Sequence, residues 1–291
     1  MSLNFLIEED VITGATLSSL AANTAKNLLT RGSLNNVFSM LTGMQLIVHS
    51  PLINVQFPAI AFSLYEELIK VATYELLPTE ELFPLFMDLP DLGYFNEKFQ
   101  RLDYGYFYST MNLGFMFLVF LFNLALYPVF LILWLLKLKF TWPTNLVNYM
   151  YDILFWQQFV FFAHATFIEI VIGILLQNQI LDSPWMVTNW VFISYILWIC
   201  LIVQAAYVLG LFLFYLWPNF KRFATDEVFL KKHSQLIEVL NYENGSSWCM
   251  IFQVSYFVRR IVLPMVAIYL NHDPTFQIFI LIGVDLFACV I

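Results

Sequence analysis

The chain has 291 residues, of which 60% are hydrophobic and only 12% are charged, whereas about a quarter of the residues in a soluble domain carry a charge. The formal net charge is −8, and no basic stripe that could follow phosphates is present, so nucleic acid is excluded as a partner. Residues 107–136 and 187–217 contain no charged side chain, and such runs are typical of membrane-spanning helices. The sequence therefore predicts a polytopic all-α membrane helix bundle whose immediate partner is the lipid bilayer.

The first 33 residues are polar to mildly amphipathic, and we expect a cytoplasmic lead-in (1–33) followed by a transmembrane helical domain (34–291). Hydrophobic runs in that domain predict about six transmembrane helices. Their expected bounds are 34–53, 107–136, 153–176, 187–217, 249–270 and 275–291. The first is the weakest of the six, because Asn35, Asn36, Gln45 and His49 interrupt it.

The pattern changes between the first two expected spans. From Pro58 to Pro78, apolar residues recur at helical spacing and polar residues occupy the opposite face. This segment is predicted to be an amphipathic helix that lies along the non-cytoplasmic membrane surface. Residues 78–105 are rich in proline, acids and aromatics and are expected to form an ordered loop. Residues 219–247 are expected to form a cytoplasmic loop.

Basic residues indicate the direction of threading, because short cytoplasmic loops are enriched in Lys and Arg. Three groups fall on one side of the six expected spans: Lys26 with Arg31, Lys137 with Lys139, and the cluster from Lys221 to Lys232. We therefore expect a cytoplasmic N-terminus. As a separate expectation, the chain lies in the plasma membrane.

The last expected span stops at Ile291, ~17 residues after Pro274, which is barely enough to cross a bilayer. We therefore expect a fragment of a longer protein. The longer protein could include an N-terminal ectodomain, and the chain could form a homo-oligomer.

The expected domain is organised around residues 249–291, which predict two antiparallel helices joined by a turn at Asn271–Pro274. Arg259 and Arg260 lie in the first helix and Asp285 in the second. Arg260 precedes the turn by eleven residues and Asp285 follows it by eleven, so both charges lie ~16 Å below the same membrane face. A charge at this depth is costly unless it is paired. We therefore expect opposite charges on the two helices to meet.

Two further polar residues are expected in the same layer of the membrane. Glu169 lies ~12 Å below the outer face and His164 one helical turn deeper. Together with Arg259, Arg260 and Asp285 they form a candidate buried charge cluster. One interpretation is a charge-transfer or ion-coordinating centre, as in voltage sensors and transporters. The other, which we favour because pairing removes most of the cost of burial, is a set of structural ion pairs that holds the helices in register.

Motifs of soluble enzymes are absent from the sequence, which has no G-x-G-x-x-G, Walker, G-x-S-x-G or H-E-x-x-H pattern. The four histidines are far apart, and the three cysteines fall in or beside apolar segments without metal-ligand spacing. We therefore expect no enzymatic activity, no cofactor and no metal.

Three parts of the chain together carry a family resemblance. They are Leu41–Leu46 with Pro51–Ala59, Asn96–Phe99 leading into Tyr108–Leu118, and Tyr256–Ile261 with Pro274–Gln277. With these segments the chain resembles, over roughly residues 34–291, the TRP-like C-terminal membrane domain of large ciliate surface proteins. In that family a long cysteine-rich ectodomain precedes the helices, and this chain lacks such a region.

The resemblance implies a TRP-like domain that serves as an ion-channel-related subunit or as the membrane anchor of a receptor. A six-span channel places its pore helix and filter between the last two spans, and Asn271–Pro274 is too short to form them. Either the pore lies beyond Ile291, or this bundle is a sensor-like or anchoring part. The alternative is a secondary transporter that uses the cluster of Arg, Asp, Glu and His side chains as its coupling site, although no internal repeat is visible.

Overall fold

The computed structural model of the chain describes residues 44–72, 83, 85–139, 144–152, 163–164, 166–181, 188–226, 229 and 249–290. All regular structure in these residues is helical, without a strand, so the all-α prediction is confirmed. The elements are α3 (Ala59–Ala72), α5 (Glu97–Arg101), α6 (Ser109–Asn112), α7 (Gly114–Lys137), α8 (Thr144–Asp152), α10 (Phe167–Asn178), α11 (Asn189–Gly210), α13 (Cys249–Tyr269) and α14 (Pro274–Val290). Shorter turns are η1 (Ser50–Leu52), η3 (Leu211–Leu216) and η4 (Phe220–Ala224).

Helix α10 lies at the centre of the described fold and packs against α6, α11 and α13. Nine of its 12 residues are buried, including Glu169 and Gln177. A helix without a polar face has no side that favours water, so it is stable only when surrounded. Its apolar side chains divide between two hydrophobic clusters, with Phe167 in the first and Ile168 and Ile172 in the second. The two halves of the core therefore meet on this short helix.

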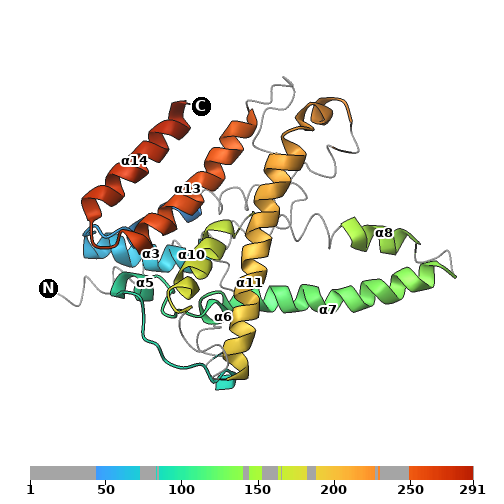
Figure 1. Cartoon of the computed structure of the whole chain (residues 1–291), viewed down its shortest axis with the longest axis horizontal. Helices are drawn as coiled ribbons and strands as arrows, with labels where there is room; N and C mark the ends of the chain where they lie inside the picture. The colour runs from blue at the N-terminus through green and yellow to red at the C-terminus, as the bar shows by residue number, and fades with distance from the viewer. Residues whose placement is uncertain are drawn as a thin grey trace, which may run out of the picture.

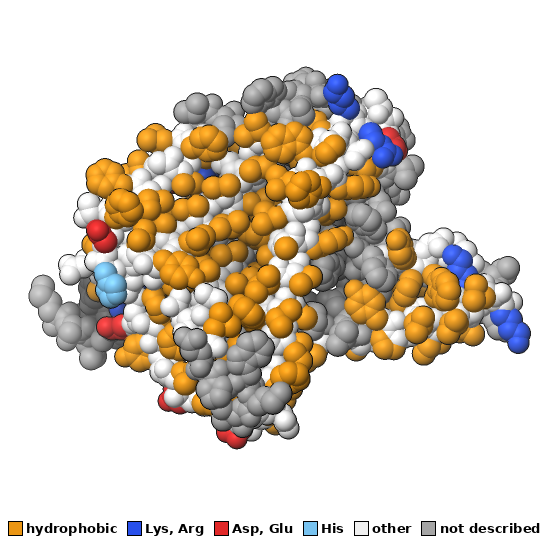
Figure 2. Space-filling view, in the orientation of Figure 1, with side chains coloured by type: hydrophobic (Ala, Val, Ile, Leu, Met, Phe, Trp, Pro, Cys, Tyr) orange, Lys and Arg blue, Asp and Glu red, His pale blue; other side chains and the backbone are white. Residues whose placement is uncertain are grey.

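Among the residues that the structure describes, two helices are long and apolar enough to cross a membrane. One is α11 continued by the π-helical η3, Asn189–Leu216, with 28 residues and a mean hydropathy of 2.4. The other, Met250–Tyr269 within α13, has 20 residues and a mean hydropathy of 1.5. The face shown in Figure 2 is covered largely by hydrophobic side chains. These features associate the chain with a membrane by length and composition.

Helices α13 and α14 form the expected antiparallel hairpin (Figure 1). The continuation of α11, η3, contacts α13 through Phe212 and Phe257, whose ring centres lie 5.0 Å apart. The turn closes through hydrogen bonds from Leu270 N–H to the Val266 carbonyl and from Asp273 N–H to the Leu270 carbonyl. Pro274 occupies the first position of α14, where its missing N–H costs no helical hydrogen bond. Asp273 Oδ1 accepts from the Phe276 backbone N–H at 3.3 Å and so caps the helix.

The structure of the second expected span differs from the single helix predicted over residues 107–136. The structure breaks this stretch at Leu113, which has φ −117° and ψ 37° and separates α6 from α7. After the buried Phe117, α7 leaves the core and runs across the direction of α11 (Figure 1). Its side chains are then mostly exposed, with Phe122 64% and Ile132 58% accessible. An all-apolar helix has no preferred packing face, so hydropathy alone does not give its direction.

The first expected span is described from Met44 onward. A helix over 44–48 gives way to the 3₁₀ turn η1, which contains Pro51. Helix α3 is present where the amphipathic pattern predicted a helix, and α5 lies inside the expected loop. The N-cap of α5 is Asn96, whose side chain accepts from the Phe99 backbone N–H.

Several expectations fall on other parts of the chain. The lead-in 1–33, the first half of the span 153–176 and most of the loop 219–247 lie outside the described residues. In that loop the structure describes η4, which follows η3 after a turn of three residues, 217–219.

Candidate functional site

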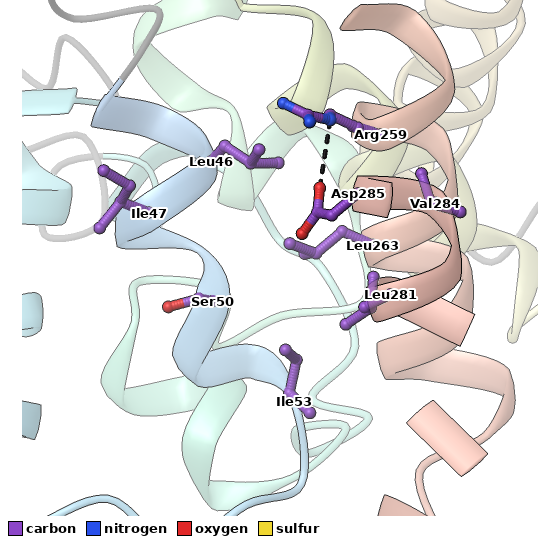
Figure 3. A pocket seen from close by; sticks show the side chains of 9 residues that line it. All are labelled: Leu46, Ile47, Ser50, Ile53, Arg259, Leu263, Leu281, Val284 and Asp285. Atoms are coloured by element: carbon purple, nitrogen blue, oxygen red, sulfur yellow. Dashed lines mark ion pairs between the residues drawn. The ribbon is translucent and has the colours of Figure 1, made fainter. Parts of the chain in front are cut away.

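Arg259 on α13 and Asp285 on α14 meet, as the short turn between their helices predicts. Arg259 Nε lies 3.1 Å from Asp285 Oδ1, and the side chains are 28% and 60% exposed. The Arg259 N–H does not point along this contact, so the two groups form an ion pair without a well-aligned hydrogen bond. Figure 3 shows the pair at one end of a groove, with the Asp285 carboxylate on its open side.

The hairpin groove lies between residues 46–53, α13 and α14 and has a volume of about 280 Å³. Its lining residues are Leu46, Ile47, Ser50, Ile53, Arg259, Leu263, Leu281, Val284 and Asp285. In Figure 3, Leu46 points across the groove toward the ion pair, whereas the Ser50 hydroxyl points away from it. The ion pair is therefore the main polar feature of a largely apolar surface.

Arg260 points to a different side of α13 from Arg259, because adjacent helical residues are ~100° apart. It is 3% exposed, and its guanidinium lies 3.5 Å from the centre of the Tyr256 ring. The His164 ring stacks on the same tyrosine, with centres 4.5 Å apart and an interplanar angle of 3°. Two groups this close to one ring centre occupy opposite faces of the ring. The arrangement is a cation–π contact backed by an aromatic stack.

Two hydrogen bonds hold His164 in this stack. The Tyr256 hydroxyl donates to the His164 backbone carbonyl at 3.1 Å. Gln253 Nε2 and His164 Nε2 are 2.7 Å apart. With the amide nitrogen as the donor, His164 Nε2 accepts and the ring proton resides on Nδ1.

Glu169 lies on a separate polar chain. It is 1% exposed and accepts a hydrogen bond from Gln45 Nε2 at 2.9 Å, across 124 residues of chain. One turn further, His49 Nδ1 lies 2.6 Å from the Gln45 backbone carbonyl and His49 Nε2 lies 2.7 Å from the Tyr104 hydroxyl. Because the carbonyl requires a donor, His49 carries its proton on Nδ1 and accepts from Tyr104 at Nε2.

The five residues predicted from sequence thus form three local arrangements. Arg259 contacts Asp285 directly, Arg260 and His164 share Tyr256, and Glu169 binds Gln45. Within the described part of the chain, no group of three His, Cys, Asp or Glu side chains could hold a metal ion. The arrangement can position charge inside an apolar environment, but its contacts are those of helix pairing rather than of a metal centre.

Sequence reasoning treated Gln45 and His49 only as interruptions of the first span. Their spacing of four residues, which places them on one face of a helix, is the signal that could have identified a buried polar face there. Tyr104 gives no such signal, because it lies in a segment expected to be a loop.

A second buried polar layer forms where α6, α10 and α11 meet. Gln177 Oε1 accepts from the Ser109 backbone N–H at 2.9 Å and from the Ser194 hydroxyl at 3.2 Å, and Thr110 Oγ1 donates to Ser194 Oγ at 3.3 Å. All four residues are at most 1% exposed. Gln177 directly follows the expected span 153–176, and the structure buries it fully. Ser109 Oγ also donates to the Gly173 carbonyl at 3.0 Å.

Two of the segments that carry the family resemblance, Pro51–Ala59 and Asn96–Phe99, meet the turn of the hairpin at Asn271. Asn54 Nδ2 donates to the Asn271 backbone carbonyl at 2.7 Å, and Asn96 Nδ2 donates to Asn271 Oδ1 at 3.3 Å. Lys98 Nζ donates to the carbonyls of Ile53 at 3.1 Å and Val55 at 2.6 Å. These contacts fasten α5 and the loop after η1 to the turn between α13 and α14. We call this set of contacts the turn interlock.

Comparisons of the chain with models of known protein families, with curated proteins and with solved structures find no match.

Proposed function

We propose that this chain is a multi-pass integral membrane protein with about six spans, a cytoplasmic N-terminus and a place in the plasma membrane. In this proposal it is a TRP-like, channel-related domain that acts as a sensor-like part or a receptor's membrane anchor and performs no catalysis. Two helices of spanning length and a largely hydrophobic surface support the membrane placement. Basic side chains at Lys137 and Lys139 support the direction of threading.

The observation that carries the proposal is the Arg259–Asp285 ion pair between two helices, α13 and α14, that are joined by a very short turn. Only residues 270–273 join α13 to α14, which leaves no length for a pore helix and selectivity filter. A pair of opposite charges at membrane depth instead fixes the register of two spans. These features favour a domain that anchors or senses over one that conducts.

The six-span threading also requires a change in α7. We propose that α7 turns about the break at Leu113 when it enters the bilayer, so that it lies along α11. Few contacts oppose such a movement, because most described side chains of α7 beyond Phe117 are exposed. The lipid would then cover an apolar surface that water does not solvate favourably.

A secondary transporter remains the second candidate, and a specific observation favours it. The buried pair Glu169–Gln45 lies beside helices that are interrupted, at Ser50 in the first expected span and at Leu113 in the second. Transporters commonly build substrate and ion sites from buried polar groups near broken helices. In this candidate function, Glu169 is the coupling carboxylate.

Topology mapping tests the membrane placement. A cysteine in place of exposed His272 should react with a membrane-impermeant maleimide from outside intact cells, and a cysteine in place of Lys139 only after permeabilisation. Asn244-Gly245-Ser246 is a glycosylation sequon. It should stay unglycosylated, because the proposed threading places it in the cytosol. Release of the chain from membranes by an alkaline wash, or a glycan on Asn244, would contradict the proposal.

Reconstitution of the full chain into planar bilayers and vesicles distinguishes an anchor or sensor-like domain from a channel and from a transporter. An anchor or sensor-like domain gives neither ohmic currents nor solute flux. Ohmic currents would identify a pore, and a small substrate-driven flux that Glu169→Gln abolishes would identify the transporter.

A further inference from the structure

We infer that the groove between α7 and α8 binds one anionic phospholipid of the cytoplasmic leaflet. We call it the arm groove, and it lies away from the charged centre between α13 and α14. The inference rests on the proposed membrane placement and adds a ligand class and a site to it.

The arm groove has the size and lining of a site for the upper part of a lipid. Its volume is about 440 Å³, and it is lined by Phe130, Leu131, Trp134, Lys137, Val147, Asn148 and Tyr151. Val147, on α8, is 3% exposed and forms the floor, whereas Trp134 and Tyr151 are 44% and 45% exposed and form walls. The Phe130 and Tyr151 rings are in contact, with centres 6.4 Å apart.

The lining of the arm groove carries one charged side chain, and that side chain is positive. Lys137 is the only ionisable side chain of its lining apart from the tyrosine hydroxyl, and none of the seven lining residues is acidic. Lys137 Nζ donates to Asn148 Oδ1 at 3.0 Å. This neutral partner positions the ammonium without cancelling its charge. An ammonium has three N–H donors, so two remain for a phosphate oxygen.

The order of groups along the groove matches the order of groups in a lipid. Lys137 is the last residue of α7, and Phe130 and Leu131 precede it by about two turns, or ~10 Å. In the proposed threading Lys137 therefore lies at the level of the headgroups, and the apolar lining extends toward the acyl chains. Trp134 and Tyr151 lie between them, as aromatic residues do at a membrane interface.

Charge selects an anionic headgroup over a zwitterionic one. A choline or ethanolamine ammonium would find no carboxylate in the lining, whereas a phosphatidylglycerol or phosphatidylserine keeps a net negative charge beside Lys137. Exposed Lys139 adds a second positive charge close by but does not line the groove. Basic side chains gather at the far end of the α7–α8 arm in Figure 2.

The experiment compares Lys137→Gln with the matched control Lys139→Gln in the full chain, purified in a neutral detergent. Native mass spectrometry measures the retention of added phosphatidylglycerol and phosphatidylcholine, and inorganic phosphate is tested separately. The wild type and Lys139→Gln should retain one phosphatidylglycerol in preference to phosphatidylcholine. Lys137→Gln should lose about tenfold in phosphatidylglycerol affinity, as expected for the loss of one charge-assisted hydrogen bond. Leu131→Trp, which adds bulk to the exposed wall, should weaken binding of the lipid.

Three results would overturn the inference: equal retention of the two lipids, equal loss in the two lysine variants, or binding of inorganic phosphate as tight as that of the lipid. Failure of the proposed function gives a different result, because the chain would then be recovered without detergent. A chain that requires detergent but shows no lipid preference would refute the lipid site alone.

Discussion

The backbone N–H of Asn54 donates to Gln277 Oε1 at 2.7 Å, joining two residues that are 223 positions apart. Gln277 is fully buried, and its Nε2 donates to the carbonyls of Val266 and Leu270 at 3.2 and 3.0 Å. One amide side chain therefore connects the start of α14, the end of α13 and the loop after η1. This bond completes the turn interlock that holds the hairpin against the rest of the described fold.

Gln277→Leu should lower the free energy of unfolding by about 1–3 kcal/mol, because it leaves the Asn54 N–H without its acceptor in a partly buried position. The control is Thr275→Ala, which changes an exposed residue of the same helix turn and should have little effect. Thermal unfolding of the detergent-solubilised chain measures both variants. Equal stability of the two variants would show that the interlock is not a significant source of stability.

Asp285→Asn should weaken the pairing of α13 with α14, and Arg259→Gln should partly restore it by removing the other charge. Arg260→Gln should not restore it, because Arg260 lies against Tyr256 on another side of α13. The Asp285 side chain is 60% exposed, so the loss in detergent should stay at or below about 1 kcal/mol. A double-mutant cycle on unfolding measures the coupling. Rescue by Arg260→Gln alone would reassign the partner of Asp285.

Glu169→Leu should destabilise the chain by about 1–3 kcal/mol, because it removes the buried acceptor of Gln45 Nε2. Glu169→Gln keeps a carbonyl oxygen in the same place and should therefore destabilise the chain less than Glu169→Leu does. Gln45→Leu should lower the free energy of unfolding less in the Glu169→Leu background than in the wild-type chain. The reason is that the two side chains share one hydrogen bond, which Glu169→Leu has already removed. Chemical denaturation in a mixed-micelle assay provides the comparison, and strict additivity would argue against a direct bond.

Gly173→Ala should destabilise the core by about 1–3 kcal/mol through overpacking. A Cβ at Gly173 would lie 2.7 Å from Leu113 Cδ1 and 3.3 Å from Leu113 Cγ, and Leu113 is itself buried. The matched control is Gly283→Ala on α14, where a Cβ meets no atom within 4 Å. There the change should be neutral or stabilising by up to about 1 kcal/mol, because alanine favours the helix. Melting temperatures that fall equally in both variants would contradict this difference in packing.

Features that depend on nearby residues could be predicted from the sequence. The hairpin follows from the short polar turn before Pro274. That an arginine of α13 meets Asp285 follows from similar numbers of residues on each side of that turn, eleven or twelve before Asn271 and eleven after Pro274, and from a fixed rise per residue. The helical pattern of α3 follows likewise from periodicity over a single segment.

Features that depend on distant residues could not be predicted in this way. The bond between Gln45 and Glu169 spans 124 residues, and hydropathy does not indicate which polar residue of one helix meets which polar residue of another. The burial of Gln177 and the break at Leu113 depend on how α6, α10 and α11 pack together. The direction of α7 could not be predicted from the sequence either. Its residues are apolar on every side, so the sequence does not show which side packs on the protein core and which faces lipid.

Helix α10 has 12 residues and is therefore only ~18 Å long, much shorter than a hydrocarbon layer of ~30 Å. Because its neighbours enclose it, hydrophobic mismatch does not act on α10 itself. In the proposed membrane placement, thickening or thinning of the bilayer would act on the longer helices around α10, which would accommodate the change by tilting. The short central helix would then serve as a fixed pivot, and the tilt of α11 and α13 about it would respond to membrane thickness and tension.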